Sequence, residues 1–350
     1  MRYFHNDYNE TCHKKVLDKV IQCCGTQMPG YGTDACCNKA AELIADAVGD
    51  KNASIHFLSG GTQTNLTVIS AALRPHQAVI APTSAHINEH ETGAIEATGH
   101  KILQLPHENG KISAEQIKAV MHEHLHGGAS CEHMAQPKLV YISFPTEYGT
   151  LYSRKELTEI RETCDKFGLY LYIDGARLGY GLSADDNDVT LPMMYMLSDA
   201  FYIGGTKLGT MFGEAVVIRN KNIAEDFRYI IKQHGGMLAK GWLLGIQFVA
   251  MFEDGLYFKL GEKANIQANK IRSALKALNY PLSYQNTTNQ IFAIIPDNIL
   301  TELEKEFTYT LWCKLGEGKS LVRFCTSWAT NDEDVDALCN ALNRLSVNLQ

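Results

Sequence analysis

The sequence predicts an α/β protein, with a mostly parallel sheet covered by helices on both faces in a large domain and a small α+β domain after it. Up to about residue 219, short apolar β-rich runs alternate with amphipathic helical stretches. This alternation is typical of a parallel sheet that is buried on both faces. Beyond that point helical sequence dominates, followed by shorter β-rich runs and a closing helix. A length of 350 residues also favours more than one domain.

Seven runs are expected to form the strands of the large domain, because each is short, apolar and bounded by glycine or polar residues. In order, they are 54–59, 77–81, 100–105, 138–144, 169–174, 199–205 and 213–218. Helices are expected between them, the first over 64–73 and the next over 113–125. The clearest helix, over 153–168, begins at a serine suited to capping its N-terminus and ends at a glycine.

The second part of the chain begins with a long helical region over 239–278. Strands are then expected over 290–296, 307–315 and 320–327, before a last helix over 331–345. No Pro- or Ser-rich linker separates the two parts. We therefore expect a soft boundary near residue 252, with a large domain at 1–252 that includes the N-terminal segment and a small C-terminal domain at 253–350.

Composition excludes several classes of function. Lys plus Arg number 32 against 39 Asp plus Glu, which gives a net charge of −7, and no basic block stands out. Nucleic acid is therefore not an expected partner. The first residues are polar and no apolar run is long enough to span a bilayer, so we expect neither a signal peptide nor a membrane segment. The ten cysteines are then expected to be free thiols in a reducing cytosol, and the protein to be cytoplasmic.

The residues that can carry chemistry lie at the carboxyl ends of the predicted strands, where open α/β sheets bind their ligands. The stretch 58–65, "LSGGTQTN", turns from a strand into a helix through Gly-Gly-Thr. Such a turn offers free backbone N–H groups, a hydroxyl and the positive end of the helix dipole, which suit a phosphate. Taken alone, it is as often only a connection between strand and helix.

Three further stretches contribute side chains. His86 follows the second strand, although a lone histidine is more often structural than catalytic. Asp174 ends an apolar strand and Arg177 follows it within Asp-Gly-Ala-Arg, an arrangement that equally fits a helix cap with an ion-pair partner. Lys207 follows a β-rich run and stands among glycines, a poor place for a solvated surface charge.

Together these stretches supply what pyridoxal 5′-phosphate requires of a protein. The cofactor needs a phosphate anchor, a ring that stacks on it, a carboxylate for its pyridinium nitrogen and a lysine for a Schiff base. Partial desolvation would lower the pKa of Lys207 and favour its neutral, nucleophilic amine. The set therefore predicts a site for this cofactor, which none of the four stretches predicts singly.

The chain resembles the threonine aldolase and aromatic amino acid β-eliminating lyase family of fold-type I pyridoxal-phosphate enzymes. The likeness extends along nearly the whole chain through the motifs YGTD, SGGTQTN, SAHI, YIDGARL, GGTKLG, HGGM and LVRFCTSWAT, in that order. The resemblance implies the fold of that enzyme class and pyridoxal 5′-phosphate as cofactor.

The resemblance also implies a role for each matched residue. Lys207 would form the Schiff base, and Asp174 would pair with the pyridinium nitrogen. His86 would stack on the ring and is the first candidate for the acid or base near the substrate hydroxyl. Arg177 would help hold the ring and the substrate, while Arg323 would clamp the amino-acid carboxylate, a task suited to a planar guanidinium. The phosphate-binding residues would be Gly60, Gly61 and Thr62.

Some positions depart from the family's better-known members. Asn6 stands where a serine near the substrate is usual. The stretch "FPTEYGT" replaces Glu-Asn-Thr-His, which leaves the roles of Thr146 and Glu147 open. Leu238 follows Gly-Gly-Met where a basic residue is expected, so Lys240 is expected to take over its phosphate contact across a subunit interface.

The reaction that the resemblance implies is retro-aldol cleavage of a β-hydroxy-α-amino acid, with L-threonine or L-allo-threonine giving glycine and acetaldehyde. β-Elimination, transamination and racemisation stay open, because the sequence does not show which bond at Cα stands perpendicular to the cofactor ring. The resemblance further implies a homodimer or homotetramer with active sites between subunits. The apolar helical stretch 241–252 fits either such a contact or an interdomain core.

The remaining alternative is a metal-binding or regulatory protein without catalysis. Its support is the stretch 122–133, which contains His122, His124, His126, Cys131 and His133. Their spacing fits no tetrahedral zinc template, and the pair His86 and His90 lacks the glutamate position of the HExxH motif. We therefore expect no metal.

Overall fold

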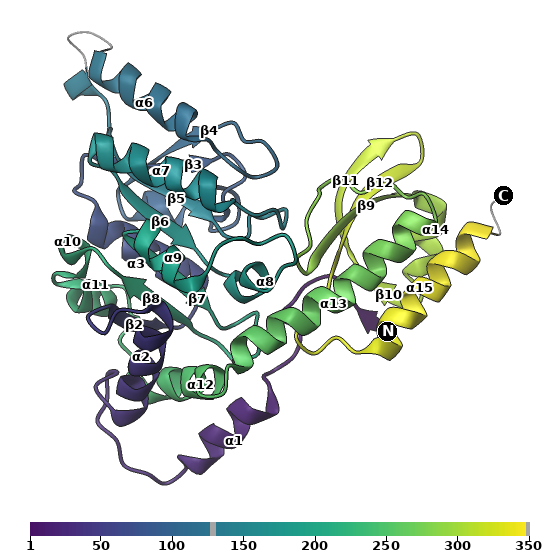
Figure 1. Ribbon diagram of the computed structural model, residues 1–350, viewed down its shortest axis with the longest axis horizontal. Helices are drawn as coiled ribbons and strands as arrows, with labels where there is room; N and C mark the ends of the chain where they lie inside the picture. The colour runs from purple at the N-terminus through teal and green to yellow at the C-terminus, as the bar shows by residue number, and fades with distance from the viewer. Residues whose placement is uncertain (127–130, 348–350) are drawn as a thin grey trace.

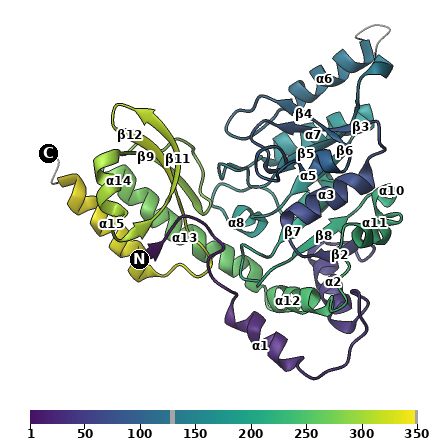
Figure 2. The same ribbon diagram turned by 180° about the vertical axis from the view of Figure 1, so that it is seen from behind.

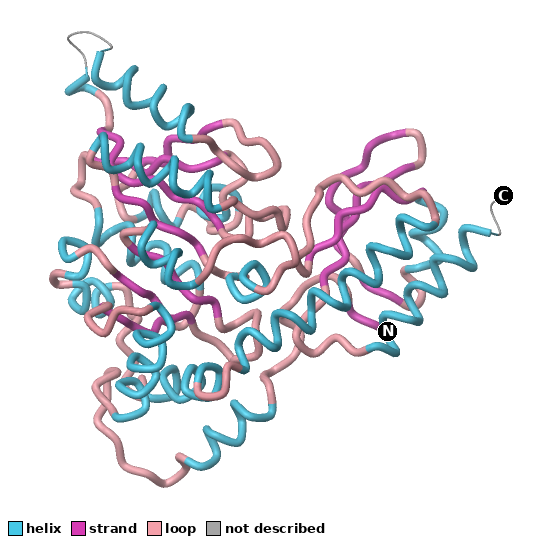
Figure 3. The backbone as a smooth tube through the Cα atoms, viewed as in Figure 1, coloured by secondary structure: helices cyan, strands magenta, loops and turns pink. Residues whose placement is uncertain are grey.

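The computed structural model describes residues 1–126 and 131–347, whose strands form a seven-stranded sheet, a three-stranded sheet and a two-stranded pair. Figure 1 shows the larger sheet and its helices on the left and the smaller sheet on the right. The long helix α13 (Leu256–Ala277) runs from one to the other. In Figure 3 the strands likewise gather into two separate groups, with helices packed against each.

The larger sheet has seven strands, and the predicted α/β fold class is confirmed. The strand order across the sheet is β2 (Ser54–Leu58), β8 (Glu214–Ile218), β7 (Ala200–Gly204), β6 (Tyr170–Asp174), β5 (Gln136–Ser143), β3 (Gln77–Pro82) and β4 (Lys101–Leu105). Strand β8 is antiparallel to both of its neighbours, and the other six point the same way. All seven predicted strands are present, shifted by at most two residues at either end.

Helices cover both faces of this sheet, as the continuous apolar runs of its strands predict. One face packs on α1 (Lys14–Gln22), α2 (Ala35–Val48), α6 (Ala114–His126), α7 (Arg154–Phe167), α9 (Leu191–Leu197) and α12 (Trp242–Phe252). The other packs on α3 (Gly61–Ala72), α4 (His86–Glu89), α5 (Ala94–Ala97), α10 (Lys221–Ala224) and α11 (Phe227–Gln233). Strand side chains alternate between the two cores, so Val140 enters the first and Tyr141 the second.

Helix α7 forms for the local reasons that its sequence predicts. Ser153 caps the N-terminus by accepting a hydrogen bond from the backbone N–H of Glu156, whose side chain accepts one in return. This reciprocal capping box satisfies two of the four N–H groups that a helix start leaves free. At the other end Gly168 takes a left-handed conformation with φ 64°, which costs glycine nothing.

The smaller sheet is antiparallel, with strand order β11 (Thr310–Gly316), β12 (Lys319–Cys325) and β9 (Gln290–Pro296). It packs on α13, α14 (Asp297–Leu303) and α15 (Asp332–Val347) around a third core. The predicted helical region 239–278 divides into α12 and α13, since Gly255 has φ 64° and breaks it. The remaining short elements are α8 (Leu178–Leu182) and the 3₁₀ turn η1 (Cys131–His133).

The N-terminus lies against the C-terminal part of the chain. Strand β1 (Arg2–Tyr3) pairs in parallel with β10 (Phe307–Thr308), and both ribbon views place the start of the chain beside α15 (Figures 1 and 2). The expected boundary near residue 252 falls at the end of α12 and stays a prediction. Within the described ranges, no helix has the length and apolar character needed to cross a membrane.

Candidate active site

A cavity of about 640 Å³ opens at the carboxyl ends of the parallel strands, between the two sheets. Its size is that of a typical small-molecule site. Of the residues singled out in the sequence, the cavity wall contains Gly60, Gly61, Thr62, His86, Asp174, Arg177, Lys207 and Arg323. The first seven come from the large sheet's turns, and Arg323 comes from β12 of the small sheet. The fold therefore brings most of the predicted set to one place.

Asp174, at the end of β6, is buried and fully hydrogen-bonded. One carboxylate oxygen accepts from the hydroxyl of Tyr141 at 2.6 Å and the amide of Asn65 at 3.1 Å. The other accepts from the hydroxyl of Tyr202 at 2.5 Å and the backbone N–H of Ala176 at 2.9 Å. Burial raises the pKa of Asp174, but the charge of His86 and these donors outweigh it and hold the pKa below its ordinary value. Asp174 is therefore a carboxylate kept ionised away from water.

The Gly-Gly-Thr turn leaves the first N–H groups of α3 open toward the cavity. Gly60 occupies the N-cap position of this twelve-residue helix and supplies no capping side chain. The wall is also tight here, because a Cβ on Gly61 would lie 3.2 Å from the hydroxyl oxygen of Tyr202. Free N–H groups and the positive end of the helix dipole at a cavity wall suit an anion such as a phosphate.

His86, on the short helix α4, is bound to a second buried carboxylate. Its Nδ1 lies 2.7 Å from Oε1 of Glu91, whose side chain is fully buried. The same oxygen accepts a 2.7 Å hydrogen bond from the amide of Asn65, which also donates to Asp174. With Glu91 ionised, Nδ1 must carry the proton, so Nε2 is the ring nitrogen left for a ligand. Glu91 and Asn65 thus connect the histidine to the aspartate through the protein interior.

Lys207 lies in the turn after β7, and its surroundings favour the neutral amine. Burial, followed by the charge of Arg177, lowers the pKa of Lys207. Glu214 of β8 faces the same cavity, and its carboxylate accepts from the Thr206 hydroxyl at 2.8 Å and the Gly205 N–H at 2.9 Å. Burial raises the pKa of Glu214 to about 7 despite these donors. The cavity wall thus contains both an amine that deprotonates easily and a carboxyl that protonates easily.

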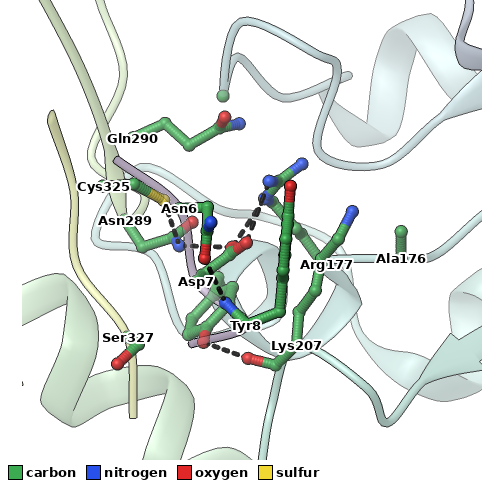
Figure 4. A network of polar contacts seen from close by, with 12 residues as sticks. Asn6, Asp7, Tyr8, Ala176, Arg177, Lys207, Asn289, Gln290, Cys325 and Ser327 are labelled. Atoms are coloured by element: carbon green, nitrogen blue, oxygen red, sulfur yellow. Dashed lines mark hydrogen bonds and ion pairs between the residues drawn. The ribbon is translucent and has the colours of Figure 1, made fainter. Parts of the chain in front are cut away.

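Arg177 is held by the N-terminal segment (Figure 4). Its Nε and one terminal nitrogen donate to the two oxygens of Asp7 at 2.7 and 3.0 Å, a bidentate pair. Asp7 is completely buried and also accepts from the amide of Asn289 at 2.9 Å. Burial raises the pKa of Asp7, but Arg177 and Lys207 outweigh it and bring the pKa to about 2. One carboxylate therefore links the N-terminus, the large sheet and the small part of the chain.

Arg323 reaches the cavity from β12. One terminal nitrogen donates to Gln290 at 3.0 Å, and the other to the backbone oxygen of His5 at 3.1 Å. Its guanidinium lies 5.6 Å from the ring centroid of Trp312, which also lines the cavity. The Nε–H is buried and has no partner. A fixed guanidinium with a free donor in a cavity wall can bind a carboxylate.

Two predicted residues do not line the cavity of this chain. Asn6 instead accepts from the backbone N–H of Tyr8 at 2.9 Å, while Tyr8 itself lines the wall. Lys240 is exposed in the segment before α12. Their expected roles at the substrate and at the phosphate stay predictions.

Sequence reasoning missed three acidic residues at the site. Glu91 and Glu214 were given no role, and Glu147 was left open, yet Glu147 and Glu214 line the cavity and Glu91 holds His86. An isolated glutamate in a sequence normally indicates a solvated surface position. A weak signal was available for Glu214, because it directly follows Gly213 at the start of a strand that is buried throughout.

The histidine-rich stretch does not form a metal centre in the part that can be described. Over residues 1–126 and 131–347, no group of three or more His, Cys, Asp or Glu side chains is placed to hold a metal ion. The stretch 122–133 lies partly outside the described residues, which exclude 127–130.

The cavity fits pyridoxal 5′-phosphate in the chemistry of its groups. The open N-terminus of α3 suits the phosphate, and the ionised Asp174 suits a protonated ring nitrogen. Lys207 offers an amine with a lowered pKa for a covalent link. The wall thus provides an anion site, a carboxylate and a nucleophilic lysine within one cavity.

Comparison with known proteins gives a consistent result. The family model described as beta-eliminating lyase matches residues 24–298. The low specificity L-threonine aldolase of a Pseudomonas species (strain NCIMB 10558) is 29% identical over 314 residues, which cover 88% of this chain and 87% of the relative. The solved structure of Leishmania major threonine aldolase is 45% identical, with a TM-score of 0.96 over 99% of this chain and all of that one. Sphingomonas wittichii serine palmitoyltransferase, at 15% identity, has a TM-score of 0.75 over 99% of this chain and 87% of its own, and so shares the fold alone.

Proposed function

The chain belongs to the beta-eliminating lyase family, and from this premise we propose that it is a pyridoxal-phosphate-dependent aldehyde-lyase of the threonine aldolase type. Its reaction is the retro-aldol cleavage of L-threonine or L-allo-threonine to glycine and acetaldehyde. The observation that carries the proposal is that three groups line one cavity. They are the amine of Lys207, whose pKa is lowered, the ionised carboxylate of Asp174, and the guanidinium of Arg323, whose Nε–H has no partner.

Each of these groups has a task in binding the cofactor. Lys207 would attach it covalently, the turn of Gly60, Gly61 and Thr62 would bind its phosphate, and Asp174 would face its ring nitrogen. When bound, the cofactor supplies an electron sink for the bond that breaks at Cα of the substrate. Because Asp174 accepts four hydrogen bonds, its carboxylate keeps its position and its charge during the reaction.

The remaining groups orient the substrate. Arg323 binds the α-carboxylate, and its contacts to Gln290 and to the His5 backbone fix the plane of the guanidinium. His86, oriented by Glu91, presents Nε2 to the cavity near the substrate hydroxyl. Release of glycine requires a proton at Cα, which Lys207 can deliver from its protonated form, because a lowered pKa makes the ammonium group a better acid.

β-Elimination is the second candidate, favoured by the description of the family model that matches most of the chain. Transamination and racemisation begin from the same bound substrate. The products separate these reactions, because elimination gives ammonia and a keto acid where aldol cleavage gives an aldehyde and glycine.

The experiment that tests the proposal is acetaldehyde release from L-threonine and L-allo-threonine with added pyridoxal phosphate, measured beside Lys207→Ala. We expect acetaldehyde and glycine in equal amounts from the natural protein and next to none from the variant. The ratio of the two rates reports the preference at Cβ. Ammonia and keto acid without acetaldehyde would replace the aldolase proposal by elimination.

We further propose that the chain works as a homodimer or homotetramer in which Lys240 approaches the phosphate of a neighbouring subunit. Lys240 supports this because it is exposed and does not line its own cavity. A fully active protein that sedimented as a monomer would contradict the proposal. We also retain 1–252 and 253–350 as the two domains.

A further inference from the structure

Two residues in the cavity wall carry a buried side-chain atom without a hydrogen-bond partner. Within the described part of the wall, these atoms are Oε2 of Glu147 and Nε of Arg323. A buried polar atom left unpaired costs about 1–3 kcal/mol, so in a cavity wall it indicates a ligand that supplies the partner. A β-hydroxy-α-amino acid offers a carboxylate to the cation and a hydroxyl to the carboxyl group.

Glu147 is held firmly by its other oxygen. Oε1 accepts from the backbone N–H of His86 at 3.1 Å and from the hydroxyl of Ser143 at 2.7 Å. Ser143 ends β5 and stands opposite Asp174 of β6 in the sheet register. The carboxyl group of Glu147 therefore lies at the carboxyl end of the large sheet, with Oε2 buried and without a hydrogen-bond partner.

The surroundings also suit Glu147 for proton transfer. Burial raises the pKa of Glu147, and the charge of Asp174 adds to the rise, while the donors Ser143 and His86 oppose it without cancelling it. A carboxyl with a raised pKa is a better general base near neutral pH than an ordinary one. The other two carboxyl groups that line this cavity, Asp174 and Glu214, already accept hydrogen bonds at both oxygens.

We propose that Glu147 is a catalytic residue, the base whose Oε2 takes the proton of the substrate's β-hydroxyl group. The inference rests on the proposed aldolase function and assigns to Glu147 a step for which the family resemblance suggested His86 first. His86 has Nδ1 committed to Glu91 and carries Glu147 on its backbone N–H, which makes it the support of this group.

The hydroxyl O–H bond breaks as its proton moves to Oε2, and the oxygen forms the C=O bond of the aldehyde. The Cα–Cβ bond breaks and leaves its electron pair at Cα, which then takes up one proton to become glycine. Oε2 returns its proton to water, so that Glu147 ends the cycle ionised as it began.

The variants Glu147→Gln, Glu147→Ala and Glu96→Gln test the proposal in the holoenzyme. Glutamine keeps an oxygen for the two donors that hold Oε1 but cannot accept the proton, whereas alanine removes both functions. Glu96 is exposed on α5 and serves as the matched control for the same chemical change. We expect Glu147→Gln to lower kcat for L-threonine about 10²–10⁴-fold, the usual size of a general-base effect, with the control unchanged.

Exchange of the Cα proton of glycine with D₂O, followed by NMR, separates the proposed step from cofactor loss. Glycine has no β-hydroxyl group, so Glu147→Gln should exchange it within about threefold of the natural rate. Lys207→Ala should abolish both reactions.

A third measurement needs no turnover. The pKa of Glu147 is raised in the fold, so its protonated form contributes stability at low pH, and this stability is lost as the group ionises when the pH rises through the folded pKa. The charged group that acts on it is Asp174, and the charge of Glu147 itself raises the pKa values of Tyr141, Tyr148 and Tyr152; the backbone N–H of His86 donates to its other oxygen. We therefore expect the melting temperature of Glu147→Gln relative to the natural protein to be higher at pH 8 than at pH 5.

The outcomes are distinct. Full activity of Glu147→Gln together with an inactive Glu147→Ala would overturn the proposal and leave Glu147 as a positioning residue for His86. Equal losses of threonine cleavage and glycine exchange in Glu147→Gln would also overturn it. If the natural protein released no aldehyde, the aldolase proposal itself would fail, and this inference with it.

Discussion

The substitution Asp7→Asn tests how the N-terminal segment holds the site together. Asp7 is completely buried, binds Arg177 through both oxygens and accepts a third hydrogen bond from Asn289 (Figure 4). Asparagine has nearly the same shape but no charge. The substitution would therefore leave the guanidinium of Arg177 buried without its counter-ion. The new NH₂ group would also face the N–H donors of Arg177 or Asn289.

The structure sets the size of the effect. The pKa of Asp7 falls from 3.8 to about 2 in the fold, and at 1.36 kcal/mol for each unit this corresponds to about 2.5 kcal/mol of stability at neutral pH. Removing one partner of a buried ion pair costs about 3–5 kcal/mol, because the remaining charge stays desolvated. We therefore expect Asp7→Asn to lower the free energy of unfolding by about 3 kcal/mol at pH 7.

The pH dependence follows from the sign of the shift. The pKa of Asp7 is depressed in the fold, so its contribution is present above about pH 4 and is lost as the pH falls towards about 2. The stability difference between the natural protein and Asp7→Asn should narrow over that interval.

Denaturant unfolding at a fixed protein concentration measures the effect, with Asp18→Asn as the matched control. Asp18 pairs with Lys14 one turn away on α1 at an exposed position, so its loss should cost less than about 1 kcal/mol. If Asp7→Asn unfolded within 1 kcal/mol of the natural protein at pH 7, or if the difference did not depend on acid pH, the reasoning would be refuted.

Three further substitutions carry expected outcomes. Glu91→Gln should lower kcat about 10-fold or more with little change in KM, because His86 loses the carboxylate that orients it. Steady-state kinetics on L-threonine would test this, and a change in KM alone would contradict it. Glu214→Gln should raise the melting temperature at pH 8 but not at pH 5.5. The pKa of Glu214 is raised to about 7, so the stability that its protonated form contributes is lost as the pH rises through that value. An equal change in melting temperature at both pH values would contradict this. Gly175→Ala should abolish folding or cofactor binding, because its Cβ would lie 1.8 Å from the backbone oxygen of Tyr202; absorbance of bound cofactor at the natural level would disprove it.

Much of the large sheet could be predicted because its strands are short apolar runs with clear ends. The helix Ala35–Val48 was not predicted, although Asp34 caps its start and Gly49 ends it in a left-handed conformation. The cysteine pair and the small residues in this segment hide its amphipathic pattern. The break at Gly255 was missed as well, because helical sequence continues on both sides of it.

Part of the candidate site could likewise be predicted from the sequence, and part could not. Lys207, Asp174 and the Gly-Gly-Thr turn could be proposed because each stands at a strand end, where parallel topology gathers ligand-binding groups. Glu147 and Glu91 could not, because their importance depends on burial, and a glutamate in a sequence carries no sign of its desolvation.

By itself, then, the sequence determined the α/β class, the family motifs and the residues that would meet a pyridoxal-phosphate cofactor. These follow from local spacing, which fixes where strands end and helices begin. Only the tertiary structure decided which charges are paired: Asp7 meets Arg177 across 170 positions of chain, and Asn65 meets Asp174 across 109. Packing selects such partners. The free-energy cost of burying a charge depends on the donors that the fold brings within hydrogen-bond distance, and these are not its neighbours in the chain.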